Sequence, residues 1–240
     1  MPSVVPQTIN VKERYALQVQ NLSKIFHTAA GKVMALKKVS FDVPEGQFVS
    51  IIGPSGSGKS TLLNMMGALD KPTRGNVLID DVDIFSLSDS TIAKLRNEKI
   101  GFVFQSFNLI NRSSVRTNVE LPGIISGMTP RQRHIRALKI LKILGILDKA
   151  NHKPNNLSGG QQQRVAIARS LMNNPKIILA DEPTGNLDTK TGEEIFHLLF
   201  NLSKKNNRTV IMITHNKELA ERTDRSIFLS DGEIEKDVLY

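Results

Sequence analysis

A glycine-rich segment carries the clearest chemistry in this sequence: residues 53–60 read Gly-Pro-Ser-Gly-Ser-Gly-Lys-Ser, which fits the pattern G-x-x-x-x-G-K-[ST]. The segment follows the apolar residues 48–52 and opens a helical stretch at residues 59–69, which is the context that this motif requires. Glycines let backbone N–H groups point inward as an anion nest, and a helix N-terminus adds partial positive charge. Lys59 then supplies a charge for the β- and γ-phosphates, and Ser60 a hydroxyl for Mg²⁺. The predicted nucleotide-binding residues of this phosphate loop are Gly53, Pro54, Ser55, Gly56, Ser57, Gly58, Lys59, Ser60 and Thr61.

Two adjacent acidic residues end another apolar run. In residues 177–182, Ile-Ile-Leu-Ala-Asp-Glu, four apolar residues describe a buried strand that delivers carboxylates to its exposed end. Asp181 can hold Mg²⁺ there, directly or through water, and Glu182 can orient or deprotonate an attacking water. Taken alone, this segment is better interpreted as a strand that ends in solvated acids. Its pairing with the phosphate loop favours a site that hydrolyses a nucleoside triphosphate.

Around these groups, apolar and polar patterns predict an α/β domain. In the N-terminal part we expect short strands at residues 15–22 and 33–43, a turn at 27–31 between them, and a hairpin at 76–85 with Asp80 and Asp81 as exposed turn carboxylates. In the second half, unbroken apolar runs predict parallel strands buried on both faces, at residues 100–104, 177–180 and 210–214. Helices are predicted between the runs, at residues 161–172 and from Thr129-Pro130 to about residue 147. Strands that alternate with helices indicate an α/β fold.

Composition narrows the class of protein further. The chain has 240 residues, is 40% hydrophobic and 23% charged, and has no cysteine, which excludes disulfides, thiol nucleophiles and cysteine-ligated metals. Its apolar runs are strand-length and its first 15 residues lack the apolar core of a signal peptide, so we expect a chain that does not cross a membrane by itself. Lysine and arginine number 32 against 23 acidic residues, a net charge of +9. That balance suits an anionic ligand, lipid headgroups or nucleic acid, although a basic surface without a partner is the simpler interpretation.

The segment Leu157-Ser-Gly-Gly-Gln161 identifies a family when it is taken with the phosphate loop and Asp181-Glu182. Together these motifs resemble the nucleotide-binding domain of ABC-type ATPases, over nearly the whole chain from about Leu17 to Ile234. The resemblance implies an α/β P-loop NTPase core with a mainly parallel sheet, an N-terminal antiparallel β subdomain and an inserted helical subdomain. It also implies one ABC ATPase domain over residues 1–240. Its parts would be a β-rich and phosphate-loop part at about 15–85, a helical subdomain with the signature at about 106–170, and the rest of the core at about 171–240.

The resemblance also assigns roles to individual residues. In the family two subunits dimerise head to tail, so that each ATP lies between one phosphate loop and the signature of the opposite subunit. The signature residues implied to contact that ATP are Ser158, Gly159, Gly160 and Gln161; Ser158 can also N-cap the helix that begins near Gln161. The remaining matches are Gln105 to the Q-loop glutamine at Mg²⁺ and water, Asp188 to the D-loop, His215 to the switch histidine near the γ-phosphate, and Phe26 to the aromatic residue, usually tyrosine, that stacks on adenine. The implied catalytic residues are therefore Lys59, Glu182 and His215, and the implied Mg²⁺ ligands are Ser60, Gln105 and Asp181.

Within the family, several stretches are similar to the lipoprotein-release and macrolide-export group: residues 101–109, 118–122, 151–164 and 181–188. The implied function is that of an ATP-hydrolysing subunit that binds ATP and Mg²⁺, forms an ATP-dependent homodimer and drives a separate transmembrane permease. Such a subunit would be cytoplasmic, peripheral on the inner face of the cell membrane, with no nucleic acid expected as a partner. Residues 111–117 depart from the group's usual pattern, close to the expected permease contact. The alternatives are a soluble ABC ATPase that acts on nucleic acid or ribosomes, and a regulatory ATP-binding subunit without turnover.

Overall fold

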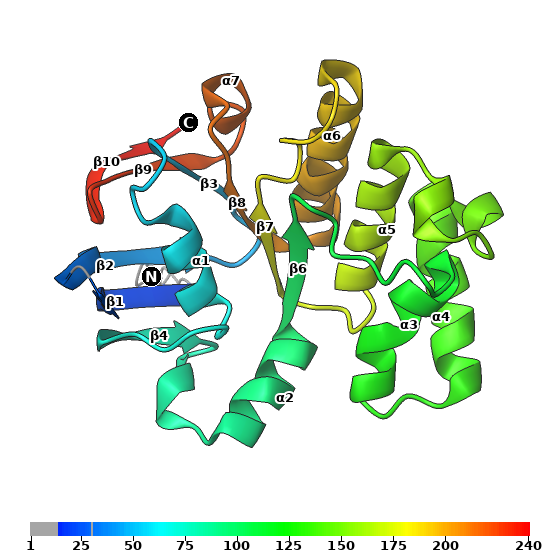
Figure 1. Ribbon diagram of the computed structural model, residues 1–240, viewed down its shortest axis with the longest axis horizontal. Coiled ribbons are helices and arrows are strands. Elements are labelled where there is room, and N and C mark those ends of the chain that lie inside the picture. Colours follow the sequence, from blue (N-terminus) through cyan, green and yellow to red (C-terminus); the bar gives the residue numbers. More distant parts are fainter. Residues whose placement is uncertain (1–13, 30) are drawn as a thin grey trace, which may run out of the picture.

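The computed structural model describes residues 14–29 and 31–240, which form two sheets with helices packed around them (Figure 1). The larger sheet has the strand order β10-β9-β3-β8-β7-β6, parallel except for β10. Its strands are β3 (Phe48–Ile52), β6 (Ile100–Phe104), β7 (Ile177–Asp181), β8 (Thr209–Ile213), β9 (Arg225–Ser230) and β10 (Glu233–Leu239). The three unbroken apolar runs of the second half are thus confirmed as neighbouring parallel strands. Strands β7 and β8 are buried on both faces, whereas Phe102 and Phe104 of the edge strand β6 are partly exposed.

An antiparallel sheet precedes and flanks the parallel one, with the order β2-β1-β4-β5. Its strands are β1 (Tyr15–Thr28), β2 (Gly31–Pro44), β4 (Arg74–Ile79) and β5 (Val82–Asp83). The predicted hairpin at residues 76–85 forms, and Asp80 and Asp81 take left-handed backbone angles at its bend. The strand expected at 15–22 continues to Thr28, because its pairing with β2 continues past the irregular register at Leu22. Asp80 is not simply a solvated carboxylate, since its oxygens bind the ammonium groups of Lys99 and Lys176.

Helices connect and cover the strands: α1 (Lys59–Met66), α2 (Asp89–Lys99), α3 (Val115–Ile125), α4 (Pro130–Ile143), α5 (Gly159–Ser170), α6 (Thr189–Asn206) and α7 (Lys217–Ala220). Single 3₁₀ turns lie at Ile84–Ser86, Leu147–Lys149 and Pro154–Asn156. The predicted helix from Thr129-Pro130 begins as expected, with Thr129 as N-cap in a capping box. It ends at Ile143, earlier than predicted, because Gly145 adopts a left-handed φ of 68°. Helix α1 likewise stops at Met66, before Ala68 with a φ of 52°.

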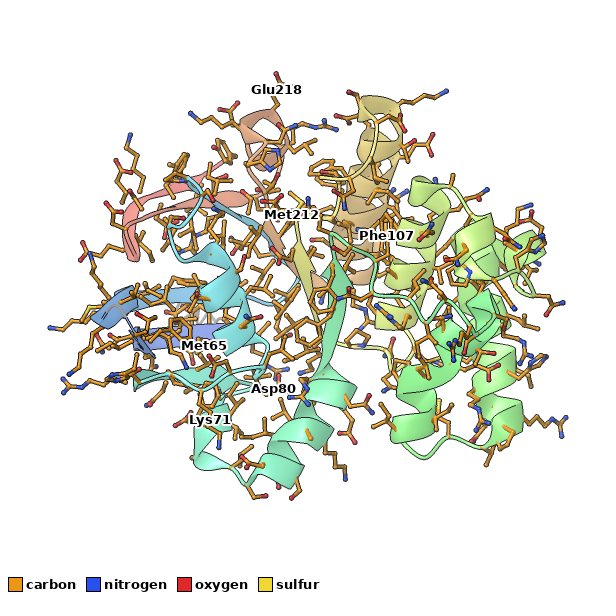
Figure 2. The ribbon with its side chains drawn as sticks, in the orientation of Figure 1. Met65, Lys71, Asp80, Phe107, Met212 and Glu218 are labelled. Atoms are coloured by element: carbon orange, nitrogen blue, oxygen red, sulfur yellow. The ribbon has the colours of Figure 1, made fainter. Side chains whose placement is uncertain are left out.

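The parallel sheet separates two hydrophobic cores. Alternate residues of β7 illustrate this: Ile177 and Leu179 pack with α1 and the antiparallel sheet, whereas Ile178 and Ala180 pack with α3, α5 and α6. Met65 of α1 belongs to the first core and Met212 of β8 to the second, and both are fully buried (Figure 2). The sheet is therefore fixed from both faces, and its strand ends present the loops that carry the predicted site.

Helices α3, α4 and α5 pack on one another beside β6, on the opposite side of the molecule from β1, β2 and β4 (Figure 1). The division of the chain into parts at about residues 15–85, 106–170 and 171–240 remains a prediction. The expectation that these parts form one ABC ATPase domain also remains a prediction. Within residues 14–29 and 31–240, no helix has the length and apolar character needed to cross a membrane. The expectation of no signal peptide falls mostly on residues 1–13, outside the described residues.

Candidate functional site

The phosphate loop lies between β3 and α1, as predicted, and two of its glycines are required by its shape. Gly58 has a φ of 102°, and a Cβ atom there would lie 2.5 Å from the carbonyl oxygen of Ala35. Gly53 has ordinary backbone angles, but its Cβ would lie 2.0 Å from the carbonyl oxygen of Leu229 on β9. Side chains at either position would push the loop away from the neighbouring strands. The glycines therefore let the loop curl close against β2 and β9.

The Lys59 side chain lies inside this curl. Its Nζ donates hydrogen bonds to the carbonyl oxygens of Gly53 at 2.9 Å and Pro54 at 2.7 Å, and the residue is only 8% exposed. The first residues of α1 place Ser60 and Thr61 next to it. A cavity of about 410 Å³ opens over the loop. It is lined by Ala35, Gly53, Ser55, Gly56, Gly58, Lys59, Ser60, Thr61, Glu182 and His215.

The predicted acidic and histidine residues meet at the edge of the same cavity. Glu182 directly follows β7 and has a φ of 43°, which is uncommon for a residue with a side chain. Its amide donates to the carbonyl oxygen of Ile213 on β8, and its Oε2 lies 3.3 Å from Nδ1 of His215. Parallel β7 and β8 thus deliver Glu182 and His215 side by side, facing the phosphate loop.

Asp181 is the last residue of β7, and its surroundings disfavour the ionised form of its carboxyl group. Burial raises the pKa of its carboxyl group, the negative charge of Glu182 raises it further, and the positive charge of Lys59 acts in the opposite direction. The carboxylate is therefore close enough to the phosphate loop to feel Lys59, and it lacks enough positive charge to offset its burial. The Asp181 carboxylate and the Ser60 hydroxyl are oxygen ligands of the kind that Mg²⁺ prefers, and the ion would supply that positive charge when bound, so the chemistry of these residues fits Mg²⁺.

Gln105 follows β6 directly and is joined to the loop after β7. Its Nε2 donates to Oδ1 of Asn186 at 3.2 Å, and Nδ2 of Asn186 donates back to the Gln105 carbonyl oxygen at 3.1 Å. Gly185 lets the two loops approach, since a Cβ there would lie 2.7 Å from Nε2 of Gln105 and 3.3 Å from Oε2 of Glu182. Gln105 thus lies beside Glu182, although it does not line the cavity over the phosphate loop.

The signature segment begins α5, as its sequence predicts. Ser158 is the N-cap, and a capping box joins its side chain and that of Gln161 to each other's backbone amides. Gly160 lies against the first turn of α6, where Asp188 is the N-cap and accepts a hydrogen bond from the Thr191 amide at 3.0 Å. Hydrogen bonds from Thr191 lower the pKa of the Asp188 carboxyl group. The structure therefore brings the signature and the D-loop together, on the other side of the molecule from α1 (Figure 1).

Phe26 lies near the end of β1 and is separate from the cavity over the phosphate loop, which it does not line. Its ring is 39% exposed, and Nζ of Lys24 lies 5.0 Å from the ring centroid. Two further residues join the loops around Glu182 by hydrogen bonds, Asn186 and Gln163, and neither was predicted from the motifs. Asn186 could have been noticed as a polar residue between two matched motifs. No local pattern marks Gln163, because its partner lies 20 residues away.

A phosphate loop between a parallel strand and a helix, facing an acid and a histidine from the neighbouring strand ends, defines a P-loop nucleoside triphosphatase. The profile of the ABC transporter family matches residues 36–185. The chain belongs to this family, as the motifs predicted, and is an ABC-type ATPase with the expected α/β P-loop core.

Individual relatives agree with this assignment. A Methanocaldococcus jannaschii protein described as the uncharacterized ABC transporter ATP-binding protein MJ0796 is 51% identical over 225 residues, 92% of this chain and 96% of the relative. A structure described as the dimeric structure of MJ0796 has a TM-score of 0.86 at 50% identity and covers 93% of this chain and 98% of that one. The "macrolide export ATP-binding/permease protein MacB" of Brucella melitensis is 47% identical over 92% of this chain, which spans 34% of that relative.

Proposed function

We propose that this chain is the ATP-hydrolysing subunit of a membrane transporter, and that two copies close head to tail around two Mg-ATP. One observation carries the proposal: a single cavity combines the phosphate loop, with Lys59, and the Glu182–His215 pair. Two solved structures of MJ0796 support the dimer, since one is described as dimeric and the other as a dimeric post-hydrolysis state bound to ADP and phosphate. In this assembly Ser158, Gly159, Gly160 and Gln161 would face the ATP of the opposite subunit, with Asp188 beside them.

The geometry suggests a role for each group around the γ-phosphate. The Lys59 ammonium, which donates to two carbonyl oxygens of the phosphate loop, would neutralise the β- and γ-phosphate oxygens. Glu182 would polarise a water for attack on phosphorus and accept its proton, while the ADP oxygen leaves in line. His215, 3.3 Å from the Glu182 carboxylate, would hold that carboxylate and contact the γ-phosphate. Ser60, Asp181 and Gln105 would hold Mg²⁺, which supplies positive charge against the phosphate oxygens when bound. Phe26 would stack on the adenine.

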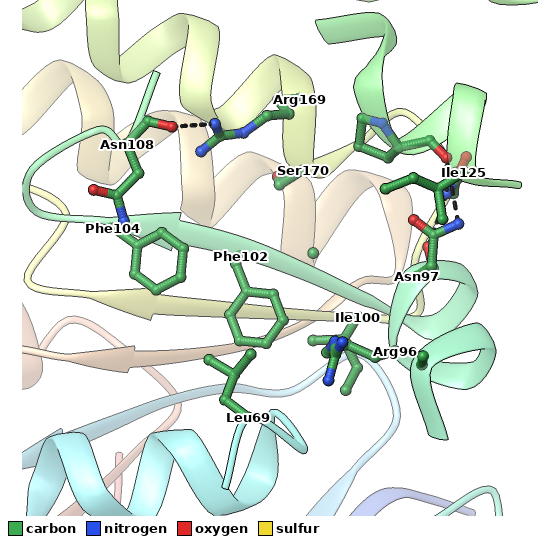
Figure 3. Close-up of a pocket in the computed structure, with 14 residues that line it drawn as sticks. Leu69, Arg96, Asn97, Ile100, Phe102, Phe104, Asn108, Ile125, Arg169 and Ser170 are labelled. Carbon is green, nitrogen blue, oxygen red and sulfur yellow. Dashed lines mark hydrogen bonds between the residues drawn. The ribbon is translucent and has the colours of Figure 1, made fainter. Parts of the chain in front are cut away.

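A second cavity, of about 390 Å³, offers a docking surface for the transporter's membrane subunit (Figure 3). Phe102 and Phe104 of β6 stack 5.6 Å apart on its floor, and Leu69 and Ile125, which are 45% and 75% exposed, stand at its rim. We assign it to a helical segment of a permease, because the MacB relatives carry ATP-binding and permease parts in one chain. Gln105, which lies beside Glu182, directly follows Phe104 in the chain. A permease helix in contact with Phe104 would therefore lie one residue away from Gln105.

The permease is proposed to be of the lipoprotein-release or macrolide-export type, which would place the chain on the inner face of the cell membrane. The relatives' names favour transport over the alternative of a soluble ATPase acting on nucleic acid or ribosomes.

The test compares the wild-type chain with Glu182→Gln. We expect the wild type to hydrolyse ATP in the presence of Mg²⁺. The variant should lose turnover by on the order of 100-fold or more, because proton transfer by a positioned base contributes about that much. The variant should also accumulate as a dimer with ATP, measured by size-exclusion chromatography with light scattering. A variant as active as wild type, or one monomeric at saturating ATP, would refute the assignment. A gentle-detergent pull-down from native membranes then tests for a multi-span partner.

A further inference from the structure

The side chain of Gln163 joins the signature helix to the turn that carries Glu182. Gln163 lies in the second turn of α5 and is fully buried. Its Nε2 donates a hydrogen bond of 2.7 Å to the carbonyl oxygen of Pro183, the residue that follows Glu182. A carbonyl oxygen can only accept, so the amide must present its N–H₂ group to Pro183.

The turn that receives this hydrogen bond has an unusual shape. Glu182 has a φ of 43°, and the Gly185 amide donates to its carbonyl oxygen at 3.0 Å, so that Pro183 and Thr184 are the central residues of a tight turn. A left-handed residue with a long side chain persists only where the surroundings hold it in place. The Ile213 carbonyl oxygen fixes the turn from β8, and Gln163 fixes it from α5.

Glutamine at position 163 also lowers the stability of the folded protein. Its Oε1 is buried without a hydrogen-bond partner among the described residues. A buried acceptor without a partner lowers stability, and a methionine of similar length would fill the same space without that cost. Packing alone therefore does not account for an amide here, whereas holding the Pro183 carbonyl oxygen does.

We infer that Gln163 is a positioning residue for the catalytic carboxylate: it ties the Glu182 turn to the helix that begins with the signature. This inference rests on the proposed function of Glu182. It gives α5 a second role, because the helix whose first residues would face the partner's ATP also holds the acid that would polarise the attacking water at its own subunit's ATP. Docking of the signature and alignment of the acid would then be coupled through one buried side chain.

Gln163→Met is the informative variant. It removes the donor to Pro183 and also the unpartnered acceptor, so the two effects on stability oppose each other and the melting temperature should change little. A displaced catalytic group costs turnover steeply, so kcat should fall on the order of 10- to 100-fold, with KM for ATP within about twofold of wild type. The ATP-bound dimer should accumulate, as for Glu182→Gln, because hydrolysis slows while the signature stays in place. A purely structural role would lose dimer and turnover together.

Ser203→Ala is the matched control. Ser203 is also buried and also donates from a side chain to a backbone carbonyl, that of Gly46 at 2.8 Å. Gly46 precedes the start of β3, at the opposite edge of the parallel sheet from the strand ends that carry the acidic turn. The kcat of Ser203→Ala should remain near wild type. Gln163→Leu provides a second variant if the methionine variant does not fold. Leucine also lacks a donor to Pro183, so the same loss is expected.

The outcomes separate the two proposals. If the wild type hydrolyses ATP and Glu182→Gln is inactive, but kcat of the Gln163 variants equals that of wild type or only KM rises, the positioning role is overturned and the proposed function stands. If the wild type has no ATPase activity or Glu182→Gln is fully active, the proposed function fails, and the positioning role fails with it.

Discussion

A methyl group added at Gly160 tests how closely the signature and the D-loop are joined. Gly160 has ordinary helical angles, so alanine there should gain up to about 1 kcal/mol of helix stability. The new Cβ, however, would lie 2.2 Å from Cγ2 of Thr191 on α6, against a normal carbon–carbon contact of about 3.5–4.0 Å. Overpacking of this kind costs about 1–3 kcal/mol. We therefore expect Gly160→Ala to lower stability, the reverse of its intrinsic effect.

Thr191→Ser provides the compensating change. It removes the methyl group in the way but keeps the hydroxyl, and the next atoms of residue 191, Cβ and Oγ1, lie 3.6 and 3.9 Å from the added Cβ. The lost methyl itself costs about 0.8 kcal/mol. In that background Gly160→Ala should become neutral or stabilising, so the double-mutant cycle should give a coupling energy of about 1–3 kcal/mol.

Urea unfolding followed by circular dichroism measures the four proteins of this cycle, at equal protein concentration and without nucleotide. For a chain of this size a change of 1 kcal/mol corresponds to about 2–4 °C in melting temperature, so thermal unfolding gives an independent reading. A coupling energy below about 0.5 kcal/mol, the usual limit of additivity, would show that the two helix ends move apart freely. The reasoning that joins the signature rigidly to the D-loop would then be wrong.

Three further predictions follow from single side chains. Asp181→Asn should raise the melting temperature of the nucleotide-free protein at pH 7: the folded-state pKa of Asp181 lies above its ordinary value, so stability is lost as the pH rises from that ordinary value, about 3.9, up to the folded-state pKa. The difference should shrink as the pH falls to about 3 and below, where the carboxyl group is protonated in both states, and calorimetry across this range, with and without Mg-ATP, should show that the variant loses stabilisation by Mg-ATP. Phe26→Ala should weaken ATP binding by about 1–3 kcal/mol if the ring stacks on adenine, with Phe26→Tyr unchanged, as measured by titration of a fluorescent ATP analogue; equal affinity would assign Phe26 to packing. Ile125→Asp should abolish recovery of the membrane subunit in a detergent pull-down without changing the ATPase activity of the isolated chain, whereas Ile143→Asp, 69% exposed on α4, should change neither.

Local sequence patterns predicted the strands that deliver the site and missed several helices. Strands β3 and β6–β8 are short apolar runs bounded by glycine or polar residues, which leaves a clear pattern in the sequence. The phosphate loop is polar and rich in glycine, and it was predicted from its motif instead. Helices α2, α3 and α6 went unpredicted, although Ser88, Ser114 and Asp188 each cap one of them through a side-chain oxygen. The caps were present as a signal, but α3 also contains Pro122, which reads as a helix breaker.

The geometry around Glu182 is beyond local reasoning for a different reason. The left-handed backbone of Glu182 is held by contacts from other elements. The Gln105–Asn186 pair and the Gln163–Pro183 hydrogen bond likewise join residues from separate elements. Sequence motifs can place each loop at a strand end, because a parallel sheet puts those ends at one edge. They carry no information about which buried amide fixes a given carbonyl oxygen.

Helix α5 links the elements that an ATPase cycle must coordinate. Its N-terminus is the signature, and Gln163 holds the acidic turn. Near its C-terminal end, Arg169 donates to the carbonyl oxygens of Phe107 and Asn108, two consecutive left-handed residues just after Gln105. Figure 3 shows the hydrogen bond to Asn108. Arg169 also lines the cavity assigned to the permease. A rigid helix transmits a displacement of one end to the other, so movement of the signature toward a partner's ATP would be felt at the acid and at the permease surface together. The loops after β6 and β7 are thus joined in two ways, directly by the Gln105–Asn186 hydrogen bonds and indirectly through α5.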